Sequence, residues 1–265
     1  MPVRLIATDL DGTIVRSDGT ISARTAKALA TAEESGATVV LVTGRPPRWI
    51  APVAEATGHH GVAICSNGAL VYDLHSEAVI ESFLIPVPTV VDVVDILRGA
   101  MPDLAFAVET GADVYRSHGY RGGWITSPEN DLASYPLDEV TKYEAAKLLA
   151  SHPSMDVDDL LDRVRDLVGH LVEPTHSNGR GLVEMGALGV SKATTLAQFA
   201  AELGVAAEDV VAFGDMPNDL PMLAWAGVAY AVANAHPLVL EAVENVTDSN
   251  DDDGVAAVIE QLFQN

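Results

Sequence analysis

The stretch Asp9-Leu10-Asp11-Gly12-Thr13 follows the apolar run Val3-Arg4-Leu5-Ile6-Ala7 near the start of the chain. The apolar run predicts a buried strand, and Gly12 permits a sharp turn behind it. Two carboxylates two residues apart at the end of a strand are costly to hold together without a cation. The stretch therefore favours a metal-bound nucleophile with an acid/base group beside it. An ordinary turn built from Asp and Gly is the alternative that this stretch alone leaves open.

Length, composition and charge restrict the class of protein. The chain has 265 residues, 48% of them hydrophobic, which is enough for one large domain or two smaller ones. Its 15 basic and 38 acidic residues give a formal net charge of -23, which argues against a general nucleic-acid or anionic-membrane binder. A phosphorylated substrate is compatible with this negative charge, because a bound divalent cation can reverse the electrostatic field inside a pocket.

Cysteine usage and the N-terminus indicate the compartment. Cys65 is the single cysteine, so no internal disulfide can form, and its apolar neighbours predict a buried thiol. The N-terminal residues lack a signal-peptide pattern, and no apolar stretch reaches the ~20 residues of a membrane span. We therefore expect a cytoplasmic protein with no membrane partner, while its oligomeric state is left open.

Strands and helices alternate at both ends of the chain. The predicted strands lie at 3–8, 39–42, 61–65, 209–213 and 228–232, and the predicted helices at 22–35, 46–57, 191–203, 219–226, 236–244 and 254–263. Continuous apolar strands of this kind are covered by helices on both faces. The pattern predicts an α/β fold with a doubly wound, Rossmann-like parallel sheet.

The middle of the chain has a different pattern. After a predicted hairpin at 69–84, Pro86 and Pro88 mark a boundary. A helix then precedes strands at 104–109, 113–117, 145–150, 170–175 and 181–185, with a further helix at 157–168. We therefore expect a core domain of residues 1–85 and 186–265 and an inserted α+β domain of residues 86–185.

Two further segments carry groups suited to a phosphoryl ligand. Thr43-Gly44-Arg45 ends the 39–42 strand, at the sheet edge where α/β proteins bind ligands, and a hydroxyl and free amides there can hold phosphoryl oxygens. Lys192 falls in the first turn of a helix capped by Ser191, where a cation opposes the helix dipole. A phosphoryl group or carboxylate facing Lys192 would offset that cost. An ordinary helix-entry turn is the alternative for Thr43-Gly44-Arg45, and a solvated lysine is the alternative for Lys192.

The segment Gly214-Asp215-Met216-Pro217-Asn218-Asp219 follows another predicted strand. Asp215, Asn218 and Asp219 supply the oxygen donors that suit Mg²⁺. A polar turn in which Asn218 or Asp219 caps the next helix explains the same residues, and capping and metal binding can coexist.

In this order the four segments resemble the haloacid dehalogenase-like hydrolase superfamily, and more closely its Cof-type phosphatases. The resemblance spans the whole core and includes Asn67-Gly68-Ala69, Ala233-Asn234-Ala235 and the late segment from Thr247 to Val255. The insert lies between the second and third motifs, where that family has its α/β cap. Met216 stands where the family often has Asn, and its side chain need not bind metal.

The resemblance implies a Mg²⁺-dependent phosphatase acting on small phosphorylated metabolites, such as sugar phosphates, through an aspartyl-phosphate. Asp9 would be the nucleophile and Asp11 the general acid and then base. The implied metal ligands are Asp9, Asp11 through its backbone carbonyl, Asp215, Asn218 and Asp219. The implied substrate-binding residues are Thr43, Gly44, Arg45, Asn67, Lys192, Asn218 and Arg180, of which Thr43 and Lys192 would also stabilise the transferring group.

The cap would close over the site and select the substrate. Its candidate cations are Arg116, His118, Arg121, His176 and Arg180, although each is also explained as a solvated or structural residue. Arg180 lies between two glycines just before the return to the core, and Trp124 with Arg121 could stack on a sugar or base. A phosphomutase using the same intermediate and a non-catalytic phosphometabolite sensor are the rival functions.

Overall fold

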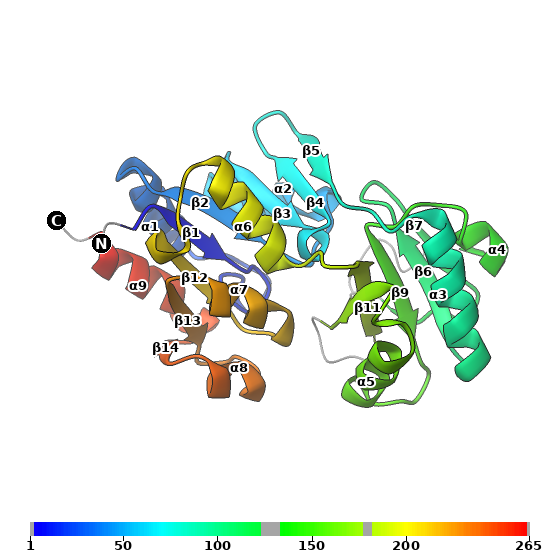
Figure 1. Ribbon diagram of the computed structural model, residues 1–265. Coiled ribbons are helices and arrows are strands. Elements are labelled where there is room, and N and C mark those ends of the chain that lie inside the picture. The colour runs from blue at the N-terminus through cyan, green and yellow to red at the C-terminus, as the bar shows by residue number, and fades with distance from the viewer. Residues whose placement is uncertain (1–2, 123–132, 177–181, 264–265) are drawn as a thin grey trace. The chain divides into compact units, whose positions relative to one another are not determined.

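The computed structural model describes residues 3–122, 133–176 and 182–263. The chain divides into two compact units (Figure 1). Residues 1–81 and 191–265 form the first, called the core unit below, and residues 82–190 form the second, called the insert unit. The predicted fold class, a doubly wound α/β core with an inserted α+β domain, is confirmed.

An eight-stranded sheet with the order β14-β13-β12-β1-β2-β3-β4-β5 forms the core unit (Figure 1). Its pairs from β14 to β3 are parallel, and β4 is antiparallel to β3. All residues of the central strand β1 are fully buried. The strands are β1 (Leu5–Thr8), β2 (Thr38–Val42), β3 (Val62–Cys65), β4 (Leu70–Asp73), β5 (Ala78–Ser82), β12 (Val210–Gly214), β13 (Val228–Val232) and β14 (Asn245–Thr247).

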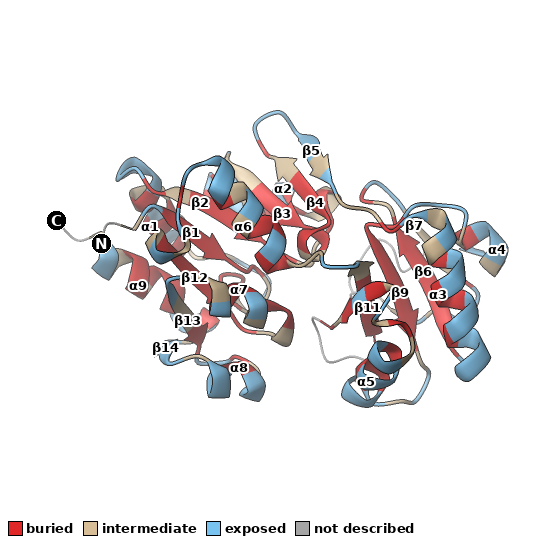
Figure 2. Ribbon diagram, in the orientation of Figure 1, coloured by how far each residue is buried: buried red, intermediate tan, exposed pale blue. Residues whose placement is uncertain are grey.

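The core helices form two groups. Helix α1 (Ala23–Glu34) contacts α2 (Ala51–Thr57) and α9 (Gly254–Leu262), whereas α6 (Lys192–Glu202) contacts α7 (Leu220–Trp225). Right-handed crossovers in the two halves of a doubly wound sheet place such groups on opposite faces. Buried strands with more exposed outer helix faces are visible in Figure 2. This two-sided cover explains the continuous apolar runs of the sequence.

The C-terminal part of the core differs from the prediction in one element. Helix α8 (Pro237–Ala242) ends before the predicted limit of 244, because Val243 takes an extended backbone with φ -107° and ψ 125°. The three-residue strand β14 follows and pairs with β13. A strand so short, with polar residues at both ends, lacks the periodicity by which a strand is detected.

The insert unit contains a six-stranded sheet with the order β10-β11-β9-β6-β7-β8. Helices α3 (Val87–Ala100) and α5 (Val157–Val168) contact each other and bury an apolar cluster that includes Val94, Phe106, Leu160 and Val183. The remaining elements are β6 (Ala105–Glu109), β7 (Val114–Ser117), β8 (Ser134–Tyr135), α4 (Leu137–Val140), β9 (Lys147–Ser151), β10 (Val172–Thr175) and β11 (Leu182–Ala187).

The insert unit extends a few residues beyond the expected range of 86–185 at both ends. Ile85 forms a β-bridge with Ala145, and β11 continues to Ala187. The bridge joins residues distant in sequence, so the local signal of Pro86 and Pro88 could not locate the first boundary. Within the described ranges of both units, every helix is too short or too polar to cross a bilayer.

Candidate active site

The carboxyl ends of four neighbouring strands bring the predicted residues to one edge of the core sheet. Asp9 follows β1, Thr43 follows β2, and Asp215 follows β12. Asn67 lies just after β3. Because these strands are parallel, their carboxyl ends meet at the same edge, where open α/β sheets bind ligands.

Lys192 lies at the centre of this group. Its side chain is 1% exposed, and Nζ donates to Asp9 Oδ1 at 2.5 Å and to Asp219 Oδ1 at 2.6 Å. The lysine is the first residue of α6, whose N-terminus is fixed by a capping box between Ser191 and Thr194. Two carboxylates therefore face Lys192, and its burial excludes a solvated lysine.

Asp219 uses both of its carboxylate oxygens within the core. Oδ1 accepts from Lys192, and Oδ2 accepts from the backbone amides of Asp215 and Met216 at 3.0 Å each. The residue is fully buried. Asp219 thus orients the ammonium and closes the turn that presents Asp215.

Asp215 is held by the turn after β1. Thr13 Oγ1 donates to Asp215 Oδ1 at 3.0 Å, and Gly12, with φ +83°, packs so closely that a Cβ there would overlap Asp215 Oδ2. Only glycine meets both demands. The sequence interpretation gave Thr13 no role, although its place in the Asp9–Thr13 stretch is the signal that could have indicated one.

The cluster contains more acidic groups than basic ones. Asp9, Asp215 and Asp219 each offer an oxygen within 4.8 Å of the others, against the single ammonium of Lys192. Burial, together with neighbouring carboxylates, raises the pKa of Asp9 to about 7 and that of Asp215 to about 9. Burial opposes the charge of Lys192, but Asp219 and Asp9 outweigh it and hold the pKa of the ammonium above its ordinary value.

The donor set fits a hard divalent cation. Buried carboxylates in excess of their cation are relieved by a second positive charge, and carboxylate, amide and carbonyl oxygens are the ligands Mg²⁺ prefers. Asn218 adds an acceptor, since its buried Oδ1 has no hydrogen-bond partner among the described residues. Asp9, Asp215 and Asn218 are thus available to such an ion, while Asp219 already has a donor for each oxygen.

Asp11 has a different partner from Asp9. Arg45 Nε donates to Asp11 Oδ2 at 2.8 Å and Nη2 donates to Oδ1 at 2.5 Å, a bidentate pair. The Asp11 side chain is 26% exposed. The sequence interpretation expected Arg45 at the substrate, whereas here its guanidinium holds the second carboxylate of the Asp9–Thr13 stretch.

The remaining predicted core residues are also accounted for. Thr43 is 1% exposed, and its Oγ1 accepts from the backbone amide of Arg45 at 3.0 Å. Asn218 Nδ2 donates to Asn67 Oδ1 at 3.1 Å, and Asn67 takes a left-handed backbone that asparagine tolerates. Gly44 lies between Thr43 and Arg45 in the same turn and is partly buried.

The cap candidates are only partly described. Arg180 and Trp124 lie outside the described residues. His118 Nδ1 lies 2.8 Å from Ser134 Oγ, and His176 Nε2 lies 3.0 Å from Asp158 Oδ1, so each has a polar partner within the insert unit.

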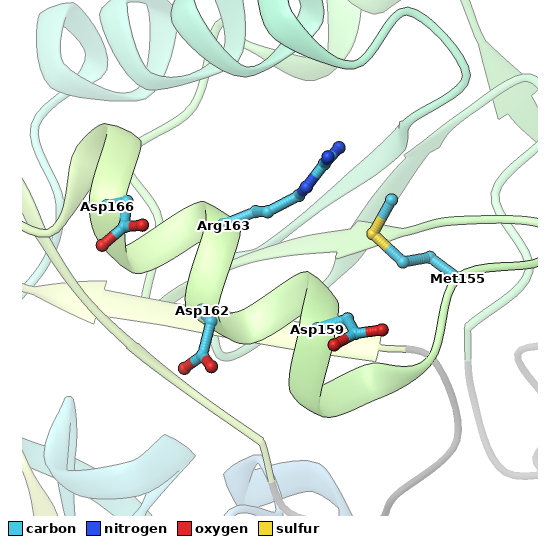
Figure 3. Close-up of a pocket in the computed structure, with 5 residues that line it drawn as sticks. All are labelled: Met155, Asp159, Asp162, Arg163 and Asp166. Atoms are coloured by element: carbon cyan, nitrogen blue, oxygen red, sulfur yellow. The ribbon is translucent and has the colours of Figure 1, made fainter.

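A cavity of about 410 Å³ in the insert unit contains none of the predicted site residues. It is lined by Met155, Asp159, Asp162, Arg163 and Asp166, and Figure 3 shows Arg163 and Asp162 leaving α5 in opposite directions. Three carboxylates against one guanidinium repel a phosphate dianion. This cavity is therefore unsuited to the phosphoryl group.

A model of a known family matches residues 6–259, and its description is haloacid dehalogenase-like hydrolase. The chain belongs to this family. The match covers all four sequence motifs and the insert, so it extends over both structural units.

Individual relatives agree with this assignment. The chain is 30% identical to the 5-amino-6-(5-phospho-D-ribitylamino)uracil phosphatase YcsE of Bacillus subtilis, over 97% of this chain and 94% of the relative. It is 30% identical to the pyridoxal phosphate phosphatase YbhA of Escherichia coli, over 98% of each chain. Among solved structures, TM0651 of Thermotoga maritima has a TM-score of 0.78 at 26% identity, over 98% of this chain and 97% of that one.

Gly68 fixes the start of α6, and Gly68→Ala should therefore disturb Lys192. Gly68 has φ +107°, and a Cβ there would overlap the carbonyl oxygen of Ser191. Gly36→Ala is the matched control, because Gly36 has φ +92° with nothing within 4 Å of its Cβ position. A left-handed backbone should destabilise both alanine variants by about 1 kcal/mol. Only Gly68→Ala should lose more stability than this and have a lower kcat. Equal melting temperatures and rates would contradict this role.

The raised pKa of Asp215 makes the stability of the metal-free protein depend on pH. Between the ordinary value of 3.8 and about 9, the folded state binds more protons than the unfolded state, so the free energy of unfolding falls as pH rises. Asp215→Asn should flatten this dependence and stabilise the protein above neutral pH. Urea unfolding in a chelator tests it, with Asp209→Asn as a control of equal charge change. The same slope in Asp215→Asn as in wild type would contradict the assignment.

Proposed function

We propose that this haloacid dehalogenase-like phosphatase hydrolyses small phosphomonoesters, such as sugar phosphates, with Mg²⁺ and through an aspartyl-phosphate on Asp9. The observation that carries the proposal is the buried contact of Lys192 Nζ with both Asp9 and Asp219 at the carboxyl edge of the sheet. It places a permanent cation against the carboxylate that would attack phosphorus. Such preorganised charge is the main source of rate in phosphoryl transfer.

Asp9 is the nucleophile in this proposal. Its Oδ1 accepts from Lys192, and none of the described residues donates to its Oδ2. In the first displacement Oδ2 forms a bond to phosphorus while the ester P–O bond breaks. In the second, a water oxygen bonds to phosphorus, the bond from phosphorus to Asp9 breaks, and inorganic phosphate leaves.

Asp11 moves the protons. It protonates the leaving alkoxide in the first displacement and takes a proton from the attacking water in the second. The bidentate contact with Arg45 fixes the plane of the Asp11 carboxylate. The partial exposure of Asp11 suits a group that exchanges protons with substrate and water, whereas the burial of Asp9 suits a nucleophile.

The phosphoryl oxygens would contact Thr43, the amide of Gly44 and Lys192, with Asn67 and Asn218 beside them. Mg²⁺, when bound, reduces the repulsion between the anionic carboxylate and the anionic phosphate. Asp9, the backbone carbonyl of Asp11, Asp215 and Asn218 would hold it. Asp219 would support the ion indirectly, by positioning Asp215 and Lys192.

Small metabolites are favoured as substrates. The substrates in the names of YcsE and YbhA are both phosphate monoesters of a primary alcohol carried by a nitrogen heterocycle. The test is phosphate release from a panel of sugar phosphates, nucleotides and phosphorylated heterocycles, including these two. Release that stops with a chelator and returns with Mg²⁺ is expected, and release that persists without metal would contradict the metal requirement.

Asp9→Asn should abolish turnover with little loss of fold, because the amide is a poor nucleophile of nearly the same shape. Phosphate release and the melting temperature are the measurements. Asp209→Asn is the control, since the Asp209 carboxylate also faces a basic side chain, that of Arg4, at 3.9 Å. Substantial remaining activity would remove Asp9 as the nucleophile.

Lys192→Ala should lower kcat by about 100- to 1000-fold, since one transition-state donor contributes roughly 3–4 kcal/mol. Lys147→Ala is the matched control, because Lys147 is also buried and lies 3.6 Å from each of two carboxylates, Glu109 and Glu184, in the insert unit. Similar loss of stability in both variants with loss of kcat only in Lys192→Ala is the expected pattern. A near-normal rate in Lys192→Ala would show that the Lys192 side chain has only a structural role.

A further inference from the structure

Two asparagines far along the sequence bind the turn that follows Asp11. Asn234, in the turn after β13, donates from Nδ2 to the Gly12 carbonyl at 2.7 Å. Asn250 donates from Nδ2 to the Val15 carbonyl at 2.9 Å. The two are joined, because the Asn250 backbone amide donates to Asn234 Oδ1 at 2.9 Å. The route from Gly12 through both asparagines to Val15 is thus an unbroken chain of hydrogen bonds.

These hydrogen bonds restrain the turn at 10–15, which few other bonds close. The amides of Thr13, Ile14 and Val15 all donate to the single Leu10 carbonyl, so the carbonyls of the turn depend on partners from elsewhere. Asn250 is buried, and its segment is fixed in turn by contacts of Ser17 with Asp251 and of Arg16 with Asp253. An unpaired carbonyl at this place would leave the turn free to move.

The turn carries groups on which the chemistry depends. Gly12 directly follows Asp11, and Thr13 donates to Asp215 Oδ1. Asn234 therefore holds the peptide between the proposed acid/base residue and the residue that orients Asp215. The 233–236 turn also reaches Asp215 directly, since the His236 amide donates to the Asp215 carbonyl at 2.8 Å.

We propose that Asn234 and Asn250, which we call the asparagine clamp, are positioning residues that hold Asp11 at the leaving-group oxygen. The proposal rests on the proposed function, in which Asp11 protonates that oxygen. The bond between Asn234 and the Gly12 carbonyl fixes the backbone next to Asp11, while Arg45 fixes its carboxylate. A displacement of about 1 Å in such a group can cost about 100-fold in rate.

Comparing two substrates with different leaving groups distinguishes a residue that positions the acid from one with a general structural effect. An alkyl phosphate needs its leaving oxygen protonated, whereas p-nitrophenolate leaves without that help. The value of kcat/KM reports the displacement that expels the leaving group, and its ratio for two substrates is independent of how much enzyme is folded. The substrates are p-nitrophenyl phosphate and the alkyl phosphate of the panel that wild type hydrolyses fastest, both with Mg²⁺.

Asn234→Ala should lower kcat/KM for the alkyl phosphate by about 100-fold and for p-nitrophenyl phosphate by about tenfold or less. Asn250→Ala, which keeps the backbone bond to Asn234, should change the ratio in the same direction by a smaller factor. If Asn234→Ala does not fold, Asn250→Ala tests the proposal in its place. Asn245→Ala is the matched control, because Asn245 is likewise exposed and donates from Nδ2 to a backbone carbonyl, that of Ala229, at 3.0 Å.

The ratio should be unchanged in Asn245→Ala. An unchanged ratio in both Asn234→Ala and Asn250→Ala, with active wild-type enzyme, would overturn the clamp and leave the proposed function intact. Wild-type enzyme that hydrolyses neither substrate would overturn the proposed catalytic route, and the clamp as a catalytic device with it.

Discussion

The buried ammonium of Lys192, shared between Asp9 and Asp219, is the interaction on which the site depends. Removing ions from water costs several kcal/mol each, and the cost is recovered only if the charges pair closely. Without this lysine, three aspartates would face one another inside the protein. Its position requires the α6 capping box, the absence of a side chain at Gly68 and the fixed turn at Asp215.

One lysine faces three carboxyl groups, and this excess of acidic groups bears on the proposed function. Burial and mutual repulsion raise the pKa of Asp9 and Asp215, which lowers the stability of the fold above neutral pH. Natural proteins tolerate such local costs where activity needs them. Here the charge that weakens the metal-free fold is the charge that would attract Mg²⁺ to the phosphoryl site.

The first motif places two carboxylates in different environments. Asp9 is buried against an ammonium, whereas Asp11 is partly exposed and paired with a planar guanidinium. Neighbouring carboxylates acquire separate roles when their surroundings differ. Lys192 and Arg45 supply that difference, and the turn behind the two carboxylates is restrained by residues from the end of the chain.

The sequence by itself determined the alternation of strands and helices, the long helix at 157–168 and the arrival of the acidic motifs at strand ends. These features follow from local periodicity, helix caps and glycine turns, which neighbouring residues specify. Only the tertiary structure decided that Arg45 binds Asp11, that Asp219 serves Lys192 and that Asn234 reaches Gly12. Each of these contacts joins residues distant in sequence, and a polar side chain finds its partner only after packing has brought the two together.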